Sequence, residues 1–457
     1  MQRLRKTKIV ATIGPASSDY ETIKKLIGAG LNVARINRSH GSYEEHIQVI
    51  ENLKRARQEL NTPTAILLDT KGPEVRIGQF ANDGINIEKG DKFTFTTEDI
   101  VGDQSKVSIS YKGICEDLEN GDVILVNDGL LKFVVESIEG TNVNCVCDLG
   151  GEMQGGKGVN FPNKILNMEY LSERDKMDLE FACQQDLDFI ACSFVSTPQD
   201  IKSVREFVDA HGGKDIELIA KIESQGGFDN LTEICDECAG VMVARGDLGV
   251  EIDFYKLPLL QKRIIQECRI MGKCVITATE MLETMKYNAR PTRAEVSDVA
   301  NAIYDGTSAI MLSAETAQGK YPVRAVETMS RIAIYAEGNS TFRDRQMAVS
   351  MVVENEIADA VAHAACTMAQ DVSAVGIVNY TETGYSSKLI SNFRSVVDAI
   401  AITGSRKVFY QLSLYWGINP MYFTGVDSYE ALFHIAKKHG RVALNPDKGD
   451  KIVVCTG

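Results

Sequence analysis

Two acidic residues and a lysine are spaced so that they could hold a divalent cation beside a reacting group. Glu223 and Asp247 lie 24 residues apart, about one strand-and-helix unit, so we expect them at the ends of adjacent strands. Two converging carboxylates suit Mg²⁺ (or Mn²⁺), which prefers oxygen ligands. Lys221 shares strand parity with Glu223, and a lysine beside Mg²⁺ suits phosphoryl transfer or an enolate. Helix capping by the acids and an ordinary ion pair of the lysine are the alternatives.

A second set of oxygen-bearing side chains follows two earlier apolar runs and carries only one formal charge. It consists of Asn37, Ser39, Asp69 and Thr70. Several neutral oxygens with a single carboxylate suit a monovalent cation better than a divalent one. Hydrogen bonding within turns is the alternative explanation.

Four basic side chains could bind phosphate in a protein whose overall charge repels it. The chain has 49 Lys and Arg against 63 Asp and Glu, and this net charge of −14 disfavours nucleic-acid and anionic-lipid partners. The candidates are Arg35, His40, Arg76 and Lys157. Arg76 and Lys157 border a β-rich stretch, which suggests a lid over a phosphorylated substrate, with solvated hinge charges as the alternative.

Eight short apolar runs, most of them followed by a helical pattern, would position these residues. The runs are rich in Val, Ile and Leu and do not strictly alternate with polar residues, as is typical of strands covered on both faces. They span Lys8–Ile13, Asn32–Ile36, Ala65–Leu68, Leu187–Cys192, Ile216–Ala220, Gly240–Val243, Lys273–Thr277 and Ser308–Leu312. Eight such units predict an α/β fold of the (β/α)8 or TIM-barrel class, whose chemistry lies at the carboxyl ends of the strands.

The pattern divides the chain into three parts. A catalytic (β/α)8 barrel is predicted over residues 1–73 and 159–345. The inserted residues 74–158 have turn signals about every ten residues and predict a small all-β lid domain. Residues 346–457 alternate helix and strand and predict an open α/β domain.

Composition is typical of a globular protein of a reducing compartment. Apolar residues make up 44% and charged residues 25%, and no apolar run reaches the roughly 18 residues of a membrane-spanning helix. The basic start lacks the apolar core of a signal peptide, so we expect a cytoplasmic location. The eleven cysteines are scattered, and buried reduced thiols are expected.

Eight strings, in order along the chain, resemble the pyruvate kinase family. They are Lys8-Ile-Val-Ala-Thr-Ile-Gly-Pro15, Leu68-Asp-Thr-Lys-Gly-Pro-Glu74, Lys157-Gly-Val-Asn160, Ala220-Lys-Ile-Glu223, Met242-Val-Ala-Arg-Gly-Asp247, Thr277-Ala-Thr279, Arg290-Pro-Thr-Arg-Ala-Glu295 and Ile310-Met-Leu-Ser313. Any one of them is a weak signal, but eight in order at predicted strand ends are specific. The resemblance implies a TIM barrel with an inserted β-barrel lid and a C-terminal α/β domain, assembled as a homotetramer.

The resemblance also implies an activity, the transfer of the phosphoryl group of phosphoenolpyruvate to ADP, which gives pyruvate and ATP in glycolysis. By this resemblance Glu223 and Asp247 hold Mg²⁺, and Lys221 stabilises the phosphoryl group in flight and then the enolate. It further assigns phosphate binding to Arg35, proton delivery to Thr279, carboxylate binding to the amides of Gly246 and Asp247, K⁺ binding to Asn37, Ser39, Asp69 and Thr70, K⁺ dependence to Glu74, and nucleotide contacts to His40, Arg76 and Lys157.

The chain departs from the usual family pattern at four places. Arg38 stands where phenylalanine is usual, and strand parity points it away from Asn37 and Ser39. Two unit charges ~6 Å apart still repel by about 3 kcal/mol at an effective dielectric near 20, so this cation could weaken the K⁺ site. Glu280 replaces glutamine beside the proton-delivering threonine, and Ala314 replaces glycine with little expected effect. The family's last strand is expected to be missing from the C-terminal domain, which predicts an unpaired sheet edge.

A loop after the first strand of the C-terminal domain resembles one that binds a sugar phosphate in many family members. It carries hydroxyls and a glycine before a helix, at Thr381, Thr383, Gly384 and Ser386. The carboxylate of Glu382 opposes a phosphate there. A fructose 1,6-bisphosphate effector and a plain helix cap stay open as alternatives.

Two other functions compete with pyruvate kinase. An Mg²⁺-dependent enolate lyase would use the same carboxylates, but it needs neither a lid, nor a K⁺ cluster, nor hinge cations. A non-enzymatic paralogue would account for Arg38 and the missing strand, but not for the presence of Lys221, Glu223, Asp247, Thr279 and Arg35 together. Pyruvate kinase is the favoured prediction.

Overall fold

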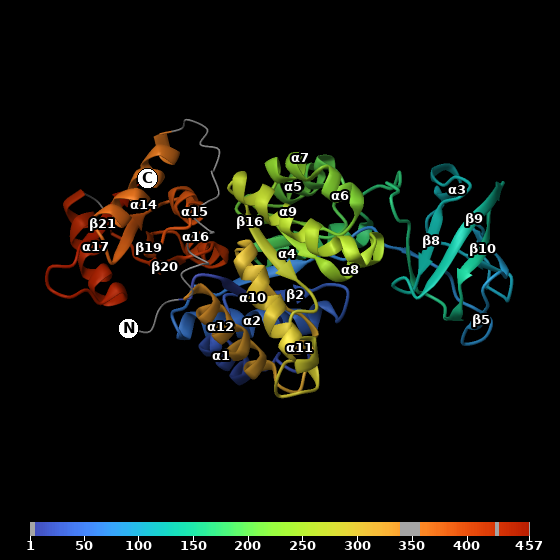
Figure 1. Ribbon diagram of the computed structural model, residues 1–457, viewed down its shortest axis with the longest axis horizontal. Helices are drawn as coiled ribbons and strands as arrows, with labels where there is room; N and C mark the ends of the chain where they lie inside the picture. The colour runs from blue at the N-terminus through green and yellow to red at the C-terminus, as the bar shows by residue number, and fades with distance from the viewer. Residues whose placement is uncertain (1–4, 339–356, 426–428, 457) are drawn as a thin grey trace.

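The computed structural model describes residues 5–338, 357–425 and 429–456, and these form three parts (Figure 1). A closed barrel lies in the middle of the long axis, with a β-rich part at one end and a mixed helix-and-sheet part at the other. The predicted boundary at residues 345–346 falls outside the described residues. Among those described, no helix is both long and apolar enough to cross a membrane.

The central part is a closed barrel of eight parallel strands in the order β1-β17-β16-β15-β14-β13-β3-β2. The strands are β1 (Lys8–Thr12), β2 (Val33–Asn37), β3 (Ala65–Asp69), β13 (Phe189–Cys192), β14 (Glu217–Ile222), β15 (Gly240–Ala244), β16 (Cys274–Ala278) and β17 (Ala309–Leu312). Each overlaps one of the eight predicted runs, and the TIM-barrel class is confirmed. Nearly all strand residues are buried, because one face packs on helices and the other fills the barrel.

Helices cover the outside of the barrel, and their starts follow the capping signals of the sequence. Ser172 with Asp175, and Thr292 with Glu295, form reciprocal capping boxes. The helices are α1 (Tyr20–Ala29), α2 (Tyr43–Glu59), α4 (Glu173–Gln184), α5 (Pro198–Ala210), α6 (Gln225–Asp229), α7 (Leu231–Asp236), α8 (Arg245–Glu251), η1 (Phe254–Lys256), α9 (Leu257–Ile270), η2 (Glu283–Lys286), α10 (Arg293–Asp305), α11 (Ala314–Ala317) and α12 (Pro322–Glu337).

The inserted part leaves and rejoins the barrel through two paired strands. Its seven-stranded sheet has the order β4 (Val75–Arg76), β12 (Gly158–Asn160), β8 (Val123–Val126), β9 (Leu131–Glu139), β10 (Asn142–Leu149), β6 (Lys92–Thr96) and β7 (Lys106–Ser108), and β5 (Ile85–Ile87) pairs with β11 (Gly151–Met153). An isolated bridge between Ile77 and Ile109 joins the two edges of the larger sheet. The expectation of strands alone was wrong in one detail, because the short helix α3 (Ile114–Asp117) lies within this part.

The C-terminal part is an open parallel sheet with helices, as predicted. The order is β20 (Ile418–Tyr422), β19 (Asp398–Thr403), β18 (Gly376–Tyr380) and β21 (Ile452–Thr456), so β20 and β21 are the edge strands. The helices are α14 (Ile357–Asp371), α15 (Tyr385–Asn392), α16 (Arg406–Gln411), η3 (Leu412–Leu414) and α17 (Tyr429–Leu444). Apolar residues of this part and of the barrel interior belong to one continuous core. All eleven cysteines are free, and none is exposed.

Candidate active site

Lys221 lies near the carboxyl end of β14 among three oxygen-bearing side chains. Its Nζ lies 2.9 Å from Glu223 Oε1 and 3.1 Å from Asp69 Oδ1, and it donates a hydrogen bond to Ser193 Oγ at 2.7 Å. Burial alone lowers the pKa of Lys221, but the carboxylates of Asp69 and Glu223 raise it above its ordinary value. The mouth of the barrel therefore holds a fixed positive charge.

Glu223 and Asp247 come from adjacent strand ends, as their spacing predicts. Glu223 follows β14, and Asp247 lies in the first turn of α8, directly after β15. Glu223 Oε2 accepts a hydrogen bond from the Phe194 amide at 2.6 Å, and the buried Oε1 lies 2.9 Å from Lys221 Nζ. Burial raises the pKa of Glu223 to about 7, against the opposing effect of Lys221. Two carboxylates at the ends of adjacent strands form an oxygen donor set that fits Mg²⁺, which takes water and substrate oxygens as its other ligands.

Thr279 follows β16 with a left-handed backbone, at a φ of 68°, which is unfavourable for a β-branched residue. Its Oγ1 accepts a hydrogen bond from the Gly246 amide at 2.8 Å and donates one to the Ala278 carbonyl at 2.6 Å. The Arg245 guanidinium holds the same turn through the Ala278 carbonyl and is itself paired with Asp298 at 2.8 Å. One of the two amides expected to bind a substrate carboxylate, that of Gly246, is thus engaged by Thr279.

Arg35 lies inside the mouth of the barrel, next to the lysine. Its Nε donates a hydrogen bond to Asp69 Oδ2 at 2.6 Å, and its Nη1 donates one to Thr12 Oγ1 at 2.8 Å. Although burial raises the pKa of Asp69, the cations of Arg35 and Lys221 bring it below its ordinary value. Arg35, Asp69, Lys221 and Glu223 therefore form a buried row of alternating charge.

The four residues expected to bind K⁺ stand at the ends of the adjacent strands β2 and β3. Asn37 and Asp69 are register partners, and Ser39 and Thr70 follow them. Asn37 Oδ1 accepts a hydrogen bond from the Ser39 amide at 3.0 Å, and Thr70 Oγ1 accepts one from the Ser193 amide at 3.2 Å. These oxygens keep a second lone pair, so the turn hydrogen bonds and a bound monovalent cation are compatible.

Arg38 points away from this oxygen cluster, as strand parity predicts. Its guanidinium is buried, and its Nε lies 2.7 Å from Asp178 Oδ1 on α4. Asp178 therefore neutralises the cation that replaces the usual phenylalanine. Of the other departures, Glu280 is exposed and Ala314 begins α11.

The basic residues expected to contact the nucleotide fall into two groups. Arg76 is paired with Glu74 at 2.6 Å and donates a hydrogen bond to the Gly156 carbonyl at 2.6 Å. Among the described residues, no hydrogen bond or ion pair engages the side chain of His40 or Lys157. The side chains of His40 and Lys157 are therefore free to bind an anionic ligand. Arg76 would have to bind such a ligand while it is also paired with Glu74.

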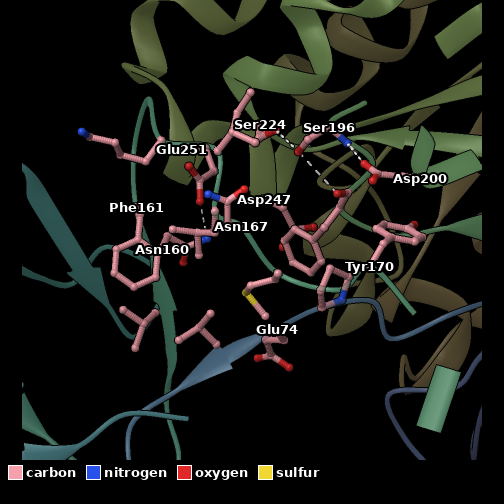
Figure 2. A pocket seen from close by; sticks show the side chains of 18 of the residues that line it. Glu74, Asn160, Phe161, Asn167, Tyr170, Ser196, Asp200, Ser224, Asp247 and Glu251 are labelled. Carbon is pink, nitrogen blue, oxygen red and sulfur yellow. Dashed lines mark hydrogen bonds between the residues drawn. The ribbon is translucent and has the colours of Figure 1, made fainter. Parts of the chain in front are cut away.

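A cavity of about 510 Å³ lies between the barrel mouth and the inserted part. Figure 2 shows Asn160 facing Glu251 on one side of this cavity, with Asp247 near them and Glu74 on the other side. Asn160 Nδ2 donates a hydrogen bond to Glu251 Oε1 at 2.7 Å, and this bond joins β12 to α8. Sequence reasoning did not single out this pair, because its members lie 91 residues apart and no local spacing relates them.

Two further neighbours of the charged row were missed although their positions marked them. Ser193 and Phe194 follow β13, and they contact Lys221 and Glu223 respectively. Phe194 has a positive φ of 55°, which directs its amide toward the carboxylate. Their position directly after a barrel strand was the signal available in the sequence. It was weak because neither side chain is charged.

In the loop expected to bind a sugar phosphate, two backbone amides donate hydrogen bonds to threonine hydroxyls of the same loop. The Gly384 amide donates to Thr381 Oγ1 at 3.0 Å, and the Tyr385 amide donates to Thr383 Oγ1 at 3.4 Å. Ser386 Oγ accepts a hydrogen bond from Asn379 Nδ2 at 2.9 Å. The N-cap residue of α15 is Gly384, and no side-chain hydrogen bond caps this helix.

Comparison with known proteins gives consistent matches over almost the whole chain. The pyruvate kinase barrel-domain family model matches residues 4–326, and the pyruvate kinase alpha/beta-domain model matches residues 359–457. The chain is 43% identical to a pyruvate kinase of Clostridium acetobutylicum over 99% of this chain and 96% of the relative. It is 44% identical to one of Clostridium perfringens, with the same two coverages. A crystal structure of a pyruvate kinase from Cryptosporidium parvum matches with a TM-score of 0.94 at 33% identity, over 98% of this chain and 93% of that one.

Proposed function

The chain belongs to the pyruvate kinase family, and from that premise we propose how its residues divide the transfer of a phosphoryl group from phosphoenolpyruvate to ADP. One observation carries the proposal, the buried ammonium of Lys221 between the carboxylates of Asp69 and Glu223. A fixed cation in a low-dielectric site stabilises the charge that develops on a phosphoryl group or an enolate.

Glu223 and Asp247 would hold Mg²⁺ (or Mn²⁺), which when bound neutralises charge on the transferred phosphoryl group. Arg35 binds the phosphate of phosphoenolpyruvate, and Lys221 follows the group in flight and then the enolate oxygen. Thr279 helps to deliver a proton to the methylene carbon, which becomes the methyl group of pyruvate. Because its hydroxyl donates to a backbone carbonyl here, that hydroxyl has to rotate toward the substrate first.

Backbone amides at the start of α8 and three basic side chains complete the binding site. The amide of Asp247 binds the substrate carboxylate. The amide of Gly246 also binds this carboxylate once its hydrogen bond to Thr279 Oγ1 is broken. His40, Arg76 and Lys157 contact the nucleotide as the lid, residues 74–158, closes over the barrel.

Asn37, Ser39, Asp69 and Thr70 would hold K⁺, and Glu74 would make turnover depend on it. The placement of all four at one edge of the barrel, with a single carboxylate, supports this assignment. The test is pyruvate formation from phosphoenolpyruvate and ADP with Mg²⁺, in KCl and in choline chloride. We expect activity in KCl only. Equal activity in both salts would contradict the K⁺ site and leave the reaction itself intact.

Glu74→Lys is the matched variant for this test. A lysine ammonium supplies in covalent form the positive charge that K⁺ would bring, so this variant should form pyruvate in choline chloride. Activity of Glu74→Lys that still requires KCl would contradict the role of Glu74.

The assembly and its control are proposed from the family alone. We expect four chains per molecule in solution, measured by light scattering, and a cytoplasmic location. Fructose 1,6-bisphosphate binding at Thr381, Thr383, Gly384 and Ser386 would have to displace the hydrogen bonds from the two loop amides to the threonine hydroxyls. Calorimetric titration with this sugar phosphate separates the two alternatives, since a plain cap gives no heat of binding.

A further inference from the structure

Arg38, which stands where the family usually has phenylalanine, is held by hydrogen bonds at its amide, its carbonyl and two nitrogens of its guanidinium. Its amide donates a hydrogen bond to the Asp69 carbonyl at 3.0 Å, and its carbonyl accepts one from Arg174 Nη2 at 3.0 Å. Its Nε donates to Asp178 Oδ1 at 2.7 Å. The residue is 2% exposed, so these bonds are made away from water.

The guanidinium of Arg38 is enclosed by α2 as well as by α4. It lies 4.0 Å from the ring centroid of Tyr43, whose hydroxyl also donates to Asp178 Oδ1 at 2.8 Å. Its Nη1 contacts His46 Nδ1. Burial and the nearby guanidinium lower the pKa of His46 to about 4, so its ring is neutral and can accept this bond at neutral pH.

The same face of α4 also holds the loop after β3. Asp175 Oδ1 accepts a hydrogen bond from the Gly72 amide at 2.9 Å. The two loops that carry the oxygens of the monovalent-cation site, after β2 and after β3, are therefore tied to one helix within a single turn. Arg38 makes this tie between Asn37 and Ser39, the two members of the site on the β2 loop.

We propose that Arg38 is a positioning residue of the monovalent-cation site, whose buried guanidinium holds the Asn37 and Ser39 oxygens against those of Asp69 and Thr70. The inference rests on the proposed K⁺ site. The charge of the Arg38 guanidinium is neutralised by Asp178, and its nitrogens anchor the loop by hydrogen bonds. Arg38 can therefore support a cation site although it is itself a cation. The expected electrostatic weakening by Arg38 is offset on this account.

The chain offers a chemically matched control for Arg38. Arg57 is also buried, its Nη1 lies 2.7 Å from the buried Asp188 Oδ2, and its guanidinium lies 3.5 Å from the Tyr410 ring centroid. Arg38→Met and Arg57→Met each leave a buried aspartate without its cation beside an aromatic ring. Both should lose stability, but only Arg38→Met disturbs the cation site. Arg38→Lys keeps the charge without the fork.

The test is a KCl titration of the melting temperature of the whole protein, at constant ionic strength in choline chloride and without substrates. We expect Arg38→Met to raise the KCl concentration of half-maximal stabilisation by about tenfold or more. The value for Arg57→Met should stay within about twofold of wild type. If Arg38→Met does not fold, Arg38→Lys should raise it by about threefold or more. The half-saturating KCl in the pyruvate assay should shift in parallel.

Two results with the variants would overturn the inference, and a third with the wild type would overturn it together with the K⁺ site. One is a folded Arg38→Met, or Arg38→Lys in its absence, with the half-saturating KCl of wild type. The other is an equal shift in Arg57→Met, which would assign the effect to general destabilisation. A wild-type protein that forms pyruvate but does not respond to KCl would overturn the K⁺ site and this inference together, while a wild-type protein that binds KCl without forming pyruvate would contradict only the assigned reaction.

Discussion

Lys221 owes its charge to its neighbours. It is buried, which on its own favours the neutral amine, and two carboxylates within 3.1 Å reverse that preference. The same two carboxylates, Asp69 and Glu223, are assigned to different metal ions. The lysine therefore couples the two proposed metal sites by sharing a partner with each.

Lys221→Met should lower kcat by about 10³-fold or more and change the KM for phosphoenolpyruvate far less, because the lost interaction forms mainly in the transition state. Steady-state kinetics at saturating Mg²⁺ and KCl measures both constants. Lys202→Met, which removes a lysine 3.3 Å from Glu237 outside the site, is the control and should keep kcat. A fall in kcat of less than about tenfold would contradict the role of Lys221.

Single residues divide clearly into those that the sequence could predict and those that it could not. Glu223 and Asp247 were predictable because adjacent barrel strands lie about one unit apart in sequence. The direction of Arg38 followed from strand parity alone. Its partner Asp178, 140 residues away, was not predictable, because only tertiary packing brings the loop after β2 next to α4. The hydrogen bond between Thr279 and the Gly246 amide depends on the positive φ of Thr279, which its residue type does not predict.

At the scale of elements, the barrel strands were predictable because burial on both faces leaves a simple apolar signature. The resemblance also implied a helix opening at Gly246 and Asp247, but not that this helix, α8, joins the proposed metal site to the inserted part. Asp247 lies in its first turn, and Glu251 lies one turn later. Through the hydrogen bond between Asn160 and Glu251, strand β12 of the inserted part is linked to the helix that carries Asp247.

Glu251→Gln should stabilise the protein increasingly as pH rises from 5 to 8. Burial raises the pKa of Glu251 from 4.5 to about 7, so the folded protein keeps a proton that the unfolded chain loses in this window. The wild-type carboxylate therefore lowers stability as pH rises, by up to about 3 kcal/mol, whereas glutamine can still accept the Asn160 hydrogen bond.

Urea unfolding of both proteins at several pH values measures this difference. Glu206→Gln, at an exposed position of α5, is the control and should show no such trend. A constant difference between Glu251→Gln and wild type across the range would contradict the buried-carboxylate argument.

At the scale of the whole molecule, the base of the barrel and the C-terminal sheet are joined by one apolar core and by buried lysines. Lys6 Nζ donates a hydrogen bond to the Ser395 carbonyl at 2.7 Å, and Lys8 Nζ donates one to the Ile418 carbonyl at 2.6 Å. Both lysines precede or begin β1, and both carbonyls belong to the C-terminal part. This seam lies at the opposite end of the strands from the active site, so it supports the barrel without entering the chemistry.

Lys8→Met should change stability with the opposite pH trend from Glu251→Gln. Burial is the main cause that lowers the pKa of Lys8 from 10.5 to about 7, with the Arg5 guanidinium adding to it. Between these values the unfolded chain binds a proton that the folded protein has released, so the wild type gains stability as pH rises. Any advantage of the methionine variant should therefore shrink between pH 7 and 9.5, by up to about 3 kcal/mol. Loss of the hydrogen bond to Ile418 lowers the free energy of unfolding by the same amount at every pH. Lys202→Met is the control, and its difference from wild type should not change with pH. A difference between Lys8→Met and wild type that is also constant would show that Lys8 is not held neutral at this seam.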